Sequence, residues 1–290
     1  MAETLDVAPF KSKISPDWCP GCGDFGVLNS LQKACAMAGV DSKDVLCVSG
    51  IGCSSNLPGF FGSYGMHTLH GRAVAVAQGA RLANTDLTVL VTGGDGDWYG
   101  IGIGHFIHAM RRNINLTYIV MNNQIYGLTT GQTSPTTDLK TMTKSTPEGN
   151  VEVPISPIEL ALVSGATFIA RGFSGSADQL SDVMCKAIKH KGFSIVDVFS
   201  PCVTYNKKNT YPWFRERVYN LQDEGHDTSS FEAAMKRTRT IDDRVPIGVF
   251  FETSAPTYEE QEAAYKFGPP VKQKLGLSLD DAKALVESFK

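Results

Sequence analysis

Two segments of the chain combine carboxylate or amide oxygens with glycines in a way that suits a metal ion bound to a phosphate. Asp95 lies between Gly94 and Gly96, and the next strand-like run ends in Asn122-Asn123. Mg²⁺ prefers such oxygens and often takes only one or two protein groups, because phosphate and water complete its shell. Glycine lets the backbone approach a phosphate and donate N–H groups to it. Either segment alone would indicate a turn or a cap, whereas the pair predicts a site for a metal ion and a diphosphate.

Four of the seven cysteines have a spacing that suits a metal centre. Cys19 and Cys22 flank a Pro-Gly turn, Cys53 follows a strand-like run, and Cys202 lies far along the chain. Four thiolates are the usual ligands of a [4Fe–4S] cluster, and structural zinc uses the same set. The spacing leaves both open, but the loop of Cys53 lies beside the predicted diphosphate site, which favours a redox-active cluster. The other cysteines are expected to be buried as small hydrophobic residues: Cys35, Cys47 and Cys185.

Strand and helix patterns alternate around these motifs. The expected strands lie at 45–49, 87–92, 116–121, 166–170 and 193–199, and the expected helices at 26–39, 70–83, 100–112, 157–163 and 177–190. This alternation predicts an α/β fold with a doubly wound, mostly parallel sheet. Ligands of such sheets bind at the carboxyl ends of the strands, where the motifs above are placed.

The chain divides into a main domain and an extension. Residues 1–209 form the expected α/β domain, which includes all four candidate cluster cysteines. Its segment 129–157 is rich in Thr, Ser, Pro and Gly and is too long for an ordinary connection, so we expect a binding loop. Residues 210–290 have a weaker pattern, with a strand near 247–251 and helices near 258–266 and 280–289. We expect this extension to pack on the domain or on a partner subunit.

Composition and local sequence exclude several classes of function. Lys and Arg number 27 against 30 Asp and Glu, so there is no strong positive field to attract nucleic acid or an anionic membrane. The longest apolar runs fall well short of the roughly 20 residues that span a bilayer. The acidic N-terminus does not resemble a secretory signal, so we expect a cytoplasmic location. Residues 21–26 match G-x-G-x-x-G, but no strand precedes them, which argues against dinucleotide binding.

The pairing of Asp95 with Asn123 resembles the signature of thiamine diphosphate-dependent enzymes, in which a main-chain carbonyl two residues after the Asn, here that of Ile125, is a further metal ligand. Over about two-thirds of its length the chain resembles the β subunits of archaeal and bacterial 2-oxoacid:ferredoxin oxidoreductases. The segments that carry this resemblance are 18–23, 49–54, 67–73, 93–97, 126–129 and 200–205. The resemblance implies the diphosphate-binding domain of thiamine enzymes as the fold.

The same resemblance assigns ligands to three groups. One [4Fe–4S] cluster would be held by Cys19, Cys22, Cys53 and Cys202. Mg²⁺ would be held by Asp95, Asn123 and Ile125. Thiamine diphosphate would be surrounded by Ile51, Gly52, Cys53, Ser54, His70, Gly96, Asp97, Gly127 and Leu128.

The reaction implied by this family is the CoA-dependent oxidative decarboxylation of a 2-oxo acid to an acyl-CoA and CO₂, with electrons passing through the cluster to ferredoxin. Thiamine enzymes also need a glutamate beside the aminopyrimidine ring, and this chain has none between Glu3 and Glu148. We therefore expect the glutamate to come from an α subunit, in an αβ or α₂β₂ enzyme, and we assign no catalytic residue to this chain.

The segments 122–129 and 144–147 most resemble the branch that acts on 2-oxoglutarate. Its distal carboxylate needs a cation or several donors, yet Asn56 stands where some broad-specificity relatives carry a Lys. Arg72 or Lys144 could substitute, or the selectivity could reside in the α subunit. The alternatives are a pyruvate-specific or broad-specificity oxidoreductase, then a non-oxidative thiamine-dependent decarboxylase, and last a zinc-binding scaffold.

Overall fold

This computed structural model describes residues 5–238, 244–274 and 276–290. Their central element is one eight-stranded sheet. Its strand order is β2-β1-β3-β4-β6-β5-β8-β7, and every pair is parallel except β5–β8. The strands are β1 (Val45–Ser49), β2 (Tyr64–His67), β3 (Thr88–Gly94), β4 (Leu116–Asn122), β5 (Phe168–Phe173), β6 (Phe193–Phe199), β7 (Val218–Asn220) and β8 (Val245–Glu252). The predicted doubly wound, mostly parallel sheet is confirmed.

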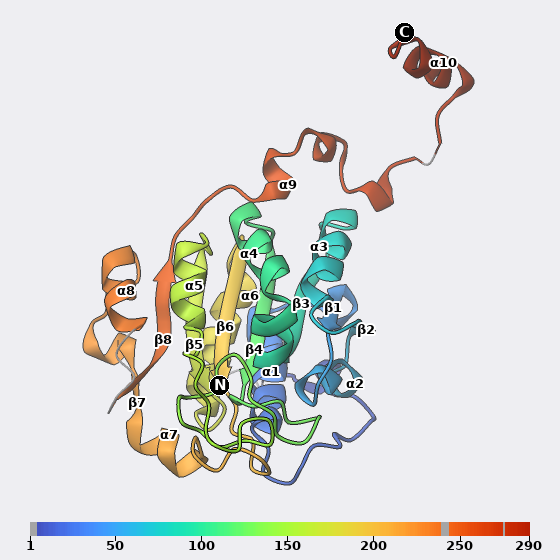
Figure 1. Ribbon diagram of the computed structural model, residues 1–290. Coiled ribbons are helices and arrows are strands. Elements are labelled where there is room, and N and C mark those ends of the chain that lie inside the picture. The colour runs from blue at the N-terminus through green and yellow to red at the C-terminus, as the bar shows by residue number, and fades with distance from the viewer. Residues whose placement is uncertain (1–4, 239–243, 275) are drawn as a thin grey trace.

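Helices cover both faces of this sheet, with α3, α4 and α5 in front and α1 and α6 behind it in Figure 1. The helices are α1 (Gly23–Ala38), α2 (Leu57–Phe60), α3 (Ala73–Ala83), α4 (Ile103–Arg112), α5 (Pro157–Val163), α6 (Ala177–Lys189), α7 (Tyr211–Arg217), α8 (Phe231–Thr238), α9 (Tyr258–Gln261) and α10 (Leu279–Glu287). Two large hydrophobic cores result, one on each face, and a smaller one packs around α7. Every residue of β4 and β6 is buried, because both faces of these central strands are covered.

The expected strands and helices of the main domain are present, and the differences occur at edges and ends. The edge strand β2 was not predicted, because it is only four residues long and all four are exposed. The helix expected at 100–112 begins with a π-helical segment, Gly96–Ile101, in which Gly100 has non-helical φ and ψ. Regular α4 therefore starts only at Ile103.

The segment after residue 209 contributes to the sheet and then leaves it. Strand β8 pairs antiparallel with β5, and β7 pairs with β8 at the edge. After α9 the chain still contacts the end of α3, where the hydroxyl of Tyr265 donates a 2.7 Å hydrogen bond to the carbonyl of Leu82 and Lys272 pairs with Asp86. It then extends away from the body, and α10 buries none of its residues (Figure 1). Within the described parts of the chain, no helix is long and apolar enough to cross a membrane.

A buried ion pair lies between two central strands. The Nε atom of Arg171 on β5 is 3.5 Å from Oδ2 of Asp197 on β6, and both side chains are almost completely buried. The guanidinium also lies between the rings of Phe199 and Phe250, at 5.1 and 5.3 Å from their centroids. Burial raises the pKa of Asp197 and lowers the pKa of Arg171, while the attraction between the two charges opposes both shifts.

We expect Arg171→Met to destabilise the fold strongly, because it leaves Asp197 buried without its cation. The expected loss is about 3–5 kcal/mol, measured by urea denaturation. Lys33→Met is a control, since it removes an ion pair to Asp178 that lies at the surface, where such pairs contribute little. Equal midpoint shifts for the two variants would contradict a structural role for the buried pair.

Candidate functional site

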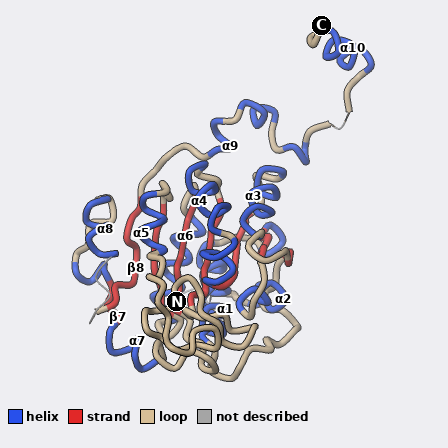
Figure 2. The backbone as a smooth tube through the Cα atoms, viewed as in Figure 1, coloured by secondary structure: helices blue, strands red, loops and turns tan. Residues whose placement is uncertain are grey.

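Two neighbouring cavities open at the carboxyl ends of β1, β3 and β4, where the long loops gather (Figure 2). The first, of about 60 Å³, is lined by all the residues predicted to bind Mg²⁺ and thiamine diphosphate, and also by Gly94, Tyr126 and Thr129. The second, of about 150 Å³, is lined by all four predicted cluster cysteines. The two cavities share four residues: Cys53, Asn123, Gly127 and Leu128. The fold therefore brings both predicted sites to one place.

Asp95 is a buried carboxylate at the end of β3. Its side chain is only 1% exposed, and its Oδ2 accepts a 2.6 Å hydrogen bond from the hydroxyl of Thr136. Burial raises the pKa of Asp95 to about 6, although hydrogen bonds from Ser134 and Thr136 oppose this shift. A cation bound here would stabilise the ionised form, so the position suits a metal ligand.

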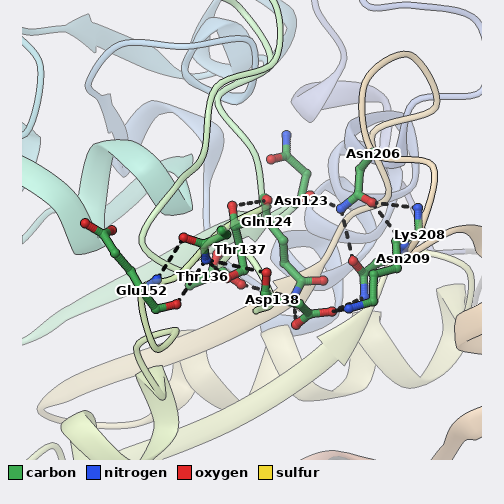
Figure 3. A network of polar contacts seen from close by, with 10 residues as sticks. Asn123, Gln124, Thr136, Thr137, Asp138, Glu152, Asn206, Lys208 and Asn209 are labelled. Carbon is green, nitrogen blue, oxygen red and sulfur yellow. Dashed lines mark hydrogen bonds and ion pairs between the residues drawn. The ribbon is translucent and has the colours of Figure 1, made fainter. Parts of the chain in front are cut away.

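The turn after β4 holds the other candidate metal ligands. Asn123 Oδ1 accepts a 3.0 Å hydrogen bond from the main-chain N–H of Ile125. Between them Gln124 has a left-handed backbone with φ of 59°, which is uncommon for a residue with a side chain. The side chain of Gln124 donates to the carbonyl of Thr136 and to Asp138, which hold this turn in place (Figure 3).

Glycines line the first cavity, and one of them, Gly127, also lines the second. A Cβ atom on Gly127 would lie 3.8 Å from Sγ of Cys53 and 3.9 Å from Sγ of Cys202. A Cβ on Gly96 would lie 2.2 Å from the ring of Tyr126. Gly52 has φ of 127°, which side-chain-bearing residues rarely adopt. Gly52 and Gly127 therefore leave their backbone open to a ligand, whereas Gly96 is required by the close packing of Tyr126.

Asp97 places a second buried carboxylate at the first cavity. Its Oδ1 accepts hydrogen bonds from the main-chain N–H groups of Gly71 at 2.8 Å and Ile51 at 3.2 Å. Nδ1 of His70 is 3.2 Å from the same oxygen, but the geometry is not that of a hydrogen bond. Oδ2 of Asp97 is buried without a hydrogen-bond partner, and burial raises the pKa of this carboxyl. Such an atom suits a ligand that brings a donor.

The four cysteines surround the second cavity from three parts of the chain. Cys19 is exposed, and Cys22, Cys53 and Cys202 are half-buried. Burial raises the pKa of Cys53 to about 11, and it raises the pKa of Cys22 further. In the described residues no three His, Cys, Asp or Glu side chains are grouped closely enough to hold one metal ion. The cysteines thus share a cavity without forming a site for a single ion.

Two supporting contacts at the site could not be predicted from the sequence. Thr136, which contacts Asp95, lies in the predicted binding loop, but nothing distinguishes it from the other threonines there. The indole of Trp18 donates a 2.7 Å hydrogen bond to the carbonyl of Cys53. Neither Arg72 nor Lys144 lines the two cavities, and these side chains contact His105 and Thr130 instead.

Comparisons with known proteins place the chain in a family. Residues 34–198 match the family described as thiamine pyrophosphate enzyme, C-terminal TPP binding domain, and residues 202–266 match the family that describes the C terminal of the pyruvate ferredoxin oxidoreductase beta subunit. A 2-oxoacid:ferredoxin oxidoreductase subunit beta from a Sulfolobus species is 46% identical over 275 residues, which is 89% of this chain and 90% of that protein.

Two further relatives are named for 2-oxoglutarate. The 2-oxoglutarate oxidoreductase subunit KorB of Mycobacterium tuberculosis is 44% identical over 197 residues, covering 68% of this chain and 53% of that protein. The structure of 2-oxoglutarate:ferredoxin oxidoreductase from Magnetococcus marinus, with 2-oxoglutarate, coenzyme A and succinyl-CoA bound, superimposes with a TM-score of 0.90. The two sequences are 42% identical, and the superposition covers 98% of this chain and 96% of the Magnetococcus chain. This chain therefore belongs to the family of the β subunits of 2-oxoacid:ferredoxin oxidoreductases.

Proposed function

We propose that this chain is the β subunit of a 2-oxoglutarate:ferredoxin oxidoreductase and that it carries Mg²⁺, thiamine diphosphate and one [4Fe–4S] cluster. The overall reaction would convert 2-oxoglutarate and CoA to succinyl-CoA and CO₂, releasing one proton and passing two electrons to ferredoxin. The observation that carries this proposal is the wall common to both cavities, in which Cys53, Asn123, Gly127 and Leu128 take part. A cofactor in one cavity would lie next to an electron acceptor in the other.

The donors at the first cavity fit a metal ion and a diphosphate. Asp95, Asn123 and the carbonyl of Ile125 would hold Mg²⁺, since all three line the cavity and offer oxygen. The glycines beside Asp95 and the turn at Gly52 would let backbone N–H groups approach the phosphates. When bound, thiamine diphosphate supplies an electron sink for decarboxylation.

The cysteine cavity favours a cluster over zinc. Structural zinc needs four ligands within about 2.3 Å of one ion, and the described side chains contain no such group. A [4Fe–4S] cluster binds each thiolate to a different iron, so its ligands lie farther apart. Because the two cavities share a wall, a redox-active group in the cysteine cavity would lie close enough to the cofactor to accept its electrons. The role of this chain would be to hold that cluster against the cofactor.

The first cavity is too small for a whole cofactor. Its volume is about 60 Å³, whereas pockets for such ligands usually enclose about 300–1,000 Å³. No glutamate of the described residues lines it. Leu128 lines this cavity and is 54% exposed, and Leu69, which precedes the lining residue His70, is 75% exposed. These observations support an α subunit that covers the cavity, completes the binding of the rings and supplies the glutamate.

The choice of 2-oxoglutarate rests on the two relatives named for it and on the motif resemblance. Arg72 and Lys144 lie outside both cavities, and Asn56 at the cysteine cavity offers no positive charge. The cation for the distal carboxylate would therefore come from the α subunit. Ferredoxin would take electrons from the cluster on the side of the exposed Cys19.

We expect Cys53→Ser to remove the cluster but not the thiamine cofactor. The αβ complex would be purified anaerobically and analysed for iron, sulfide, zinc and thiamine. Iron and sulfide should fall by most of their wild-type amount, because one of four thiolate ligands is lost. Cys185→Ser is the matched control, since Cys185 is buried on α6 away from both cavities. Zinc in the wild-type protein, or unchanged iron in Cys53→Ser, would contradict the assignment.

We expect Mg²⁺ affinity to depend on the protonation of Asp95. With its pKa raised to about 6, this carboxyl is ionised at higher pH and protonated at lower pH. Proton competition should weaken Mg²⁺ binding about tenfold for each pH unit below about 6. Titration calorimetry of the complex with thiamine diphosphate would measure this dependence. Asp95→Asn should bind weakly at every pH, and a wild-type affinity that stays constant down to about pH 5 would be inconsistent with the site.

We expect a clear preference for 2-oxoglutarate over pyruvate. In a CoA-dependent viologen-reduction assay of the αβ complex, kcat/KM should be at least about tenfold higher for 2-oxoglutarate, because recognised polar groups discriminate strongly. A higher value for pyruvate would change the substrate but leave the cofactors and the electron path as proposed.

A further inference from the structure

One buried side chain joins the loops that carry candidate ligands of the two centres. Asn206 lies four residues after Cys202, and its main-chain N–H donates a 3.2 Å hydrogen bond to the carbonyl of Cys202. Its side-chain Nδ2 donates a 3.0 Å hydrogen bond to the carbonyl of Asn123. Figure 3 shows Asn206 on the loop that follows β6, with its side chain directed toward Asn123 in the turn that follows β4. The side chain is only 5% exposed, so water does not substitute for these contacts.

The amide of Asn206 is fixed in one orientation. Besides Asn123, Nδ2 donates to Oδ1 of Asn209 at 3.2 Å. Oδ1 of Asn206 accepts from the main-chain N–H groups of Lys208 and Asn209, each at 3.0 Å. Both donors and both acceptor sites of the amide are thus used. Rotation of this side chain would leave buried polar groups without partners, which is costly.

Asp138 connects the same two loops a second time. Its Oδ1 accepts from the side chain of Gln124 at 3.2 Å, and its Oδ2 accepts from the side chain of Asn209 at 3.2 Å (Figure 3). Nζ of Lys208 lies 3.0 Å from Oδ2 as well. One carboxylate therefore holds Gln124, which follows Asn123, together with Lys208 and Asn209 in the loop of Asn206. This second connection stiffens the link between the loops.

We propose that Asn206 is a positioning residue that sets the spacing between the cluster site and the metal–diphosphate site. Asn123 lines both cavities, so a shift of its main chain moves a metal ligand relative to the cysteines. Asn206 binds that main chain directly and is fixed to the loop of Cys202 at its other side. It lines neither cavity, so it acts through Asn123 and Cys202. This inference rests on the proposed function of the two cavities.

The test compares Asn206→Ala with Gln32→Ala in the anaerobic αβ complex. Both residues are buried amides, 5% and 7% exposed, that donate to a main-chain carbonyl, but Gln32 lies on α1, bonds to Phe10 and lines neither cavity. Asn206→Ala should raise the dissociation constant of thiamine diphosphate, measured with Mg²⁺, by about tenfold, as expected for one lost buried hydrogen bond. It should also change the EPR spectrum of the reduced cluster. Gln32→Ala should leave the dissociation constant within about twofold and the spectrum unchanged.

If both variants change the dissociation constant and the EPR spectrum equally, Asn206 has only a structural role. If Asn206→Ala leaves both quantities unchanged, the inference is also overturned. If Asn206→Ala does not fold, Asn206→Asp serves in its place, because it keeps the shape and removes the donor to Asn123. Failure of the proposed function is recognised separately, since the wild-type complex would then contain no iron–sulfur cluster or no thiamine.

Discussion

Parallel pairing of β1, β3 and β4 is the constraint on which the site depends. In this register Ser49 at the end of β1 is the partner of Thr92, and Gly94 at the end of β3 is the partner of Met121. The loops that follow these three strands consequently begin at the same edge of the sheet. The first loop brings Cys53, the second Asp95 and the third Asn123. A change in this register would move the three loops apart, and the two cavities would no longer share a wall.

Burial of acidic groups follows from this arrangement. Asp24, Asp95 and Asp97 are almost completely buried beside the cavities, and burial raises the pKa of each. A raised carboxyl pKa means that the ionised form is penalised in the fold. Asp24 and Asp95 therefore reduce stability as the pH rises from their ordinary pKa of 3.8 to about 6, and Asp97 acts in the same direction. A bound cation or hydrogen-bond donor would reverse that penalty at Asp95 and Asp97. The site is thus organised for ligands more than for the stability of the chain alone.

Sequence patterns predicted the sheet, its helices and the two groups of candidate ligands, because each of these features is local. A strand run followed by Gly94-Asp95-Gly96, or a cysteine after β1, is visible within a few residues. The contacts that support these ligands join residues far apart in the chain. Thr136 reaches Asp95, and Asn206 reaches Asn123, from loops without hydrophobic periodicity. Only the folded chain reveals such pairs, and the same holds for the antiparallel addition of β8 to β5.

The central claim is that the two cavities hold an electron donor and an electron acceptor in contact. Its most direct test is EPR spectroscopy of the anaerobic αβ complex, frozen after mixing with 2-oxoglutarate, with and without CoA. We predict the signal of a reduced [4Fe–4S] cluster on addition of 2-oxoglutarate, at a site on this chain, with further electron release when CoA is present. A complex that binds thiamine diphosphate and decarboxylates the substrate but shows no iron–sulfur signal would contradict the claim.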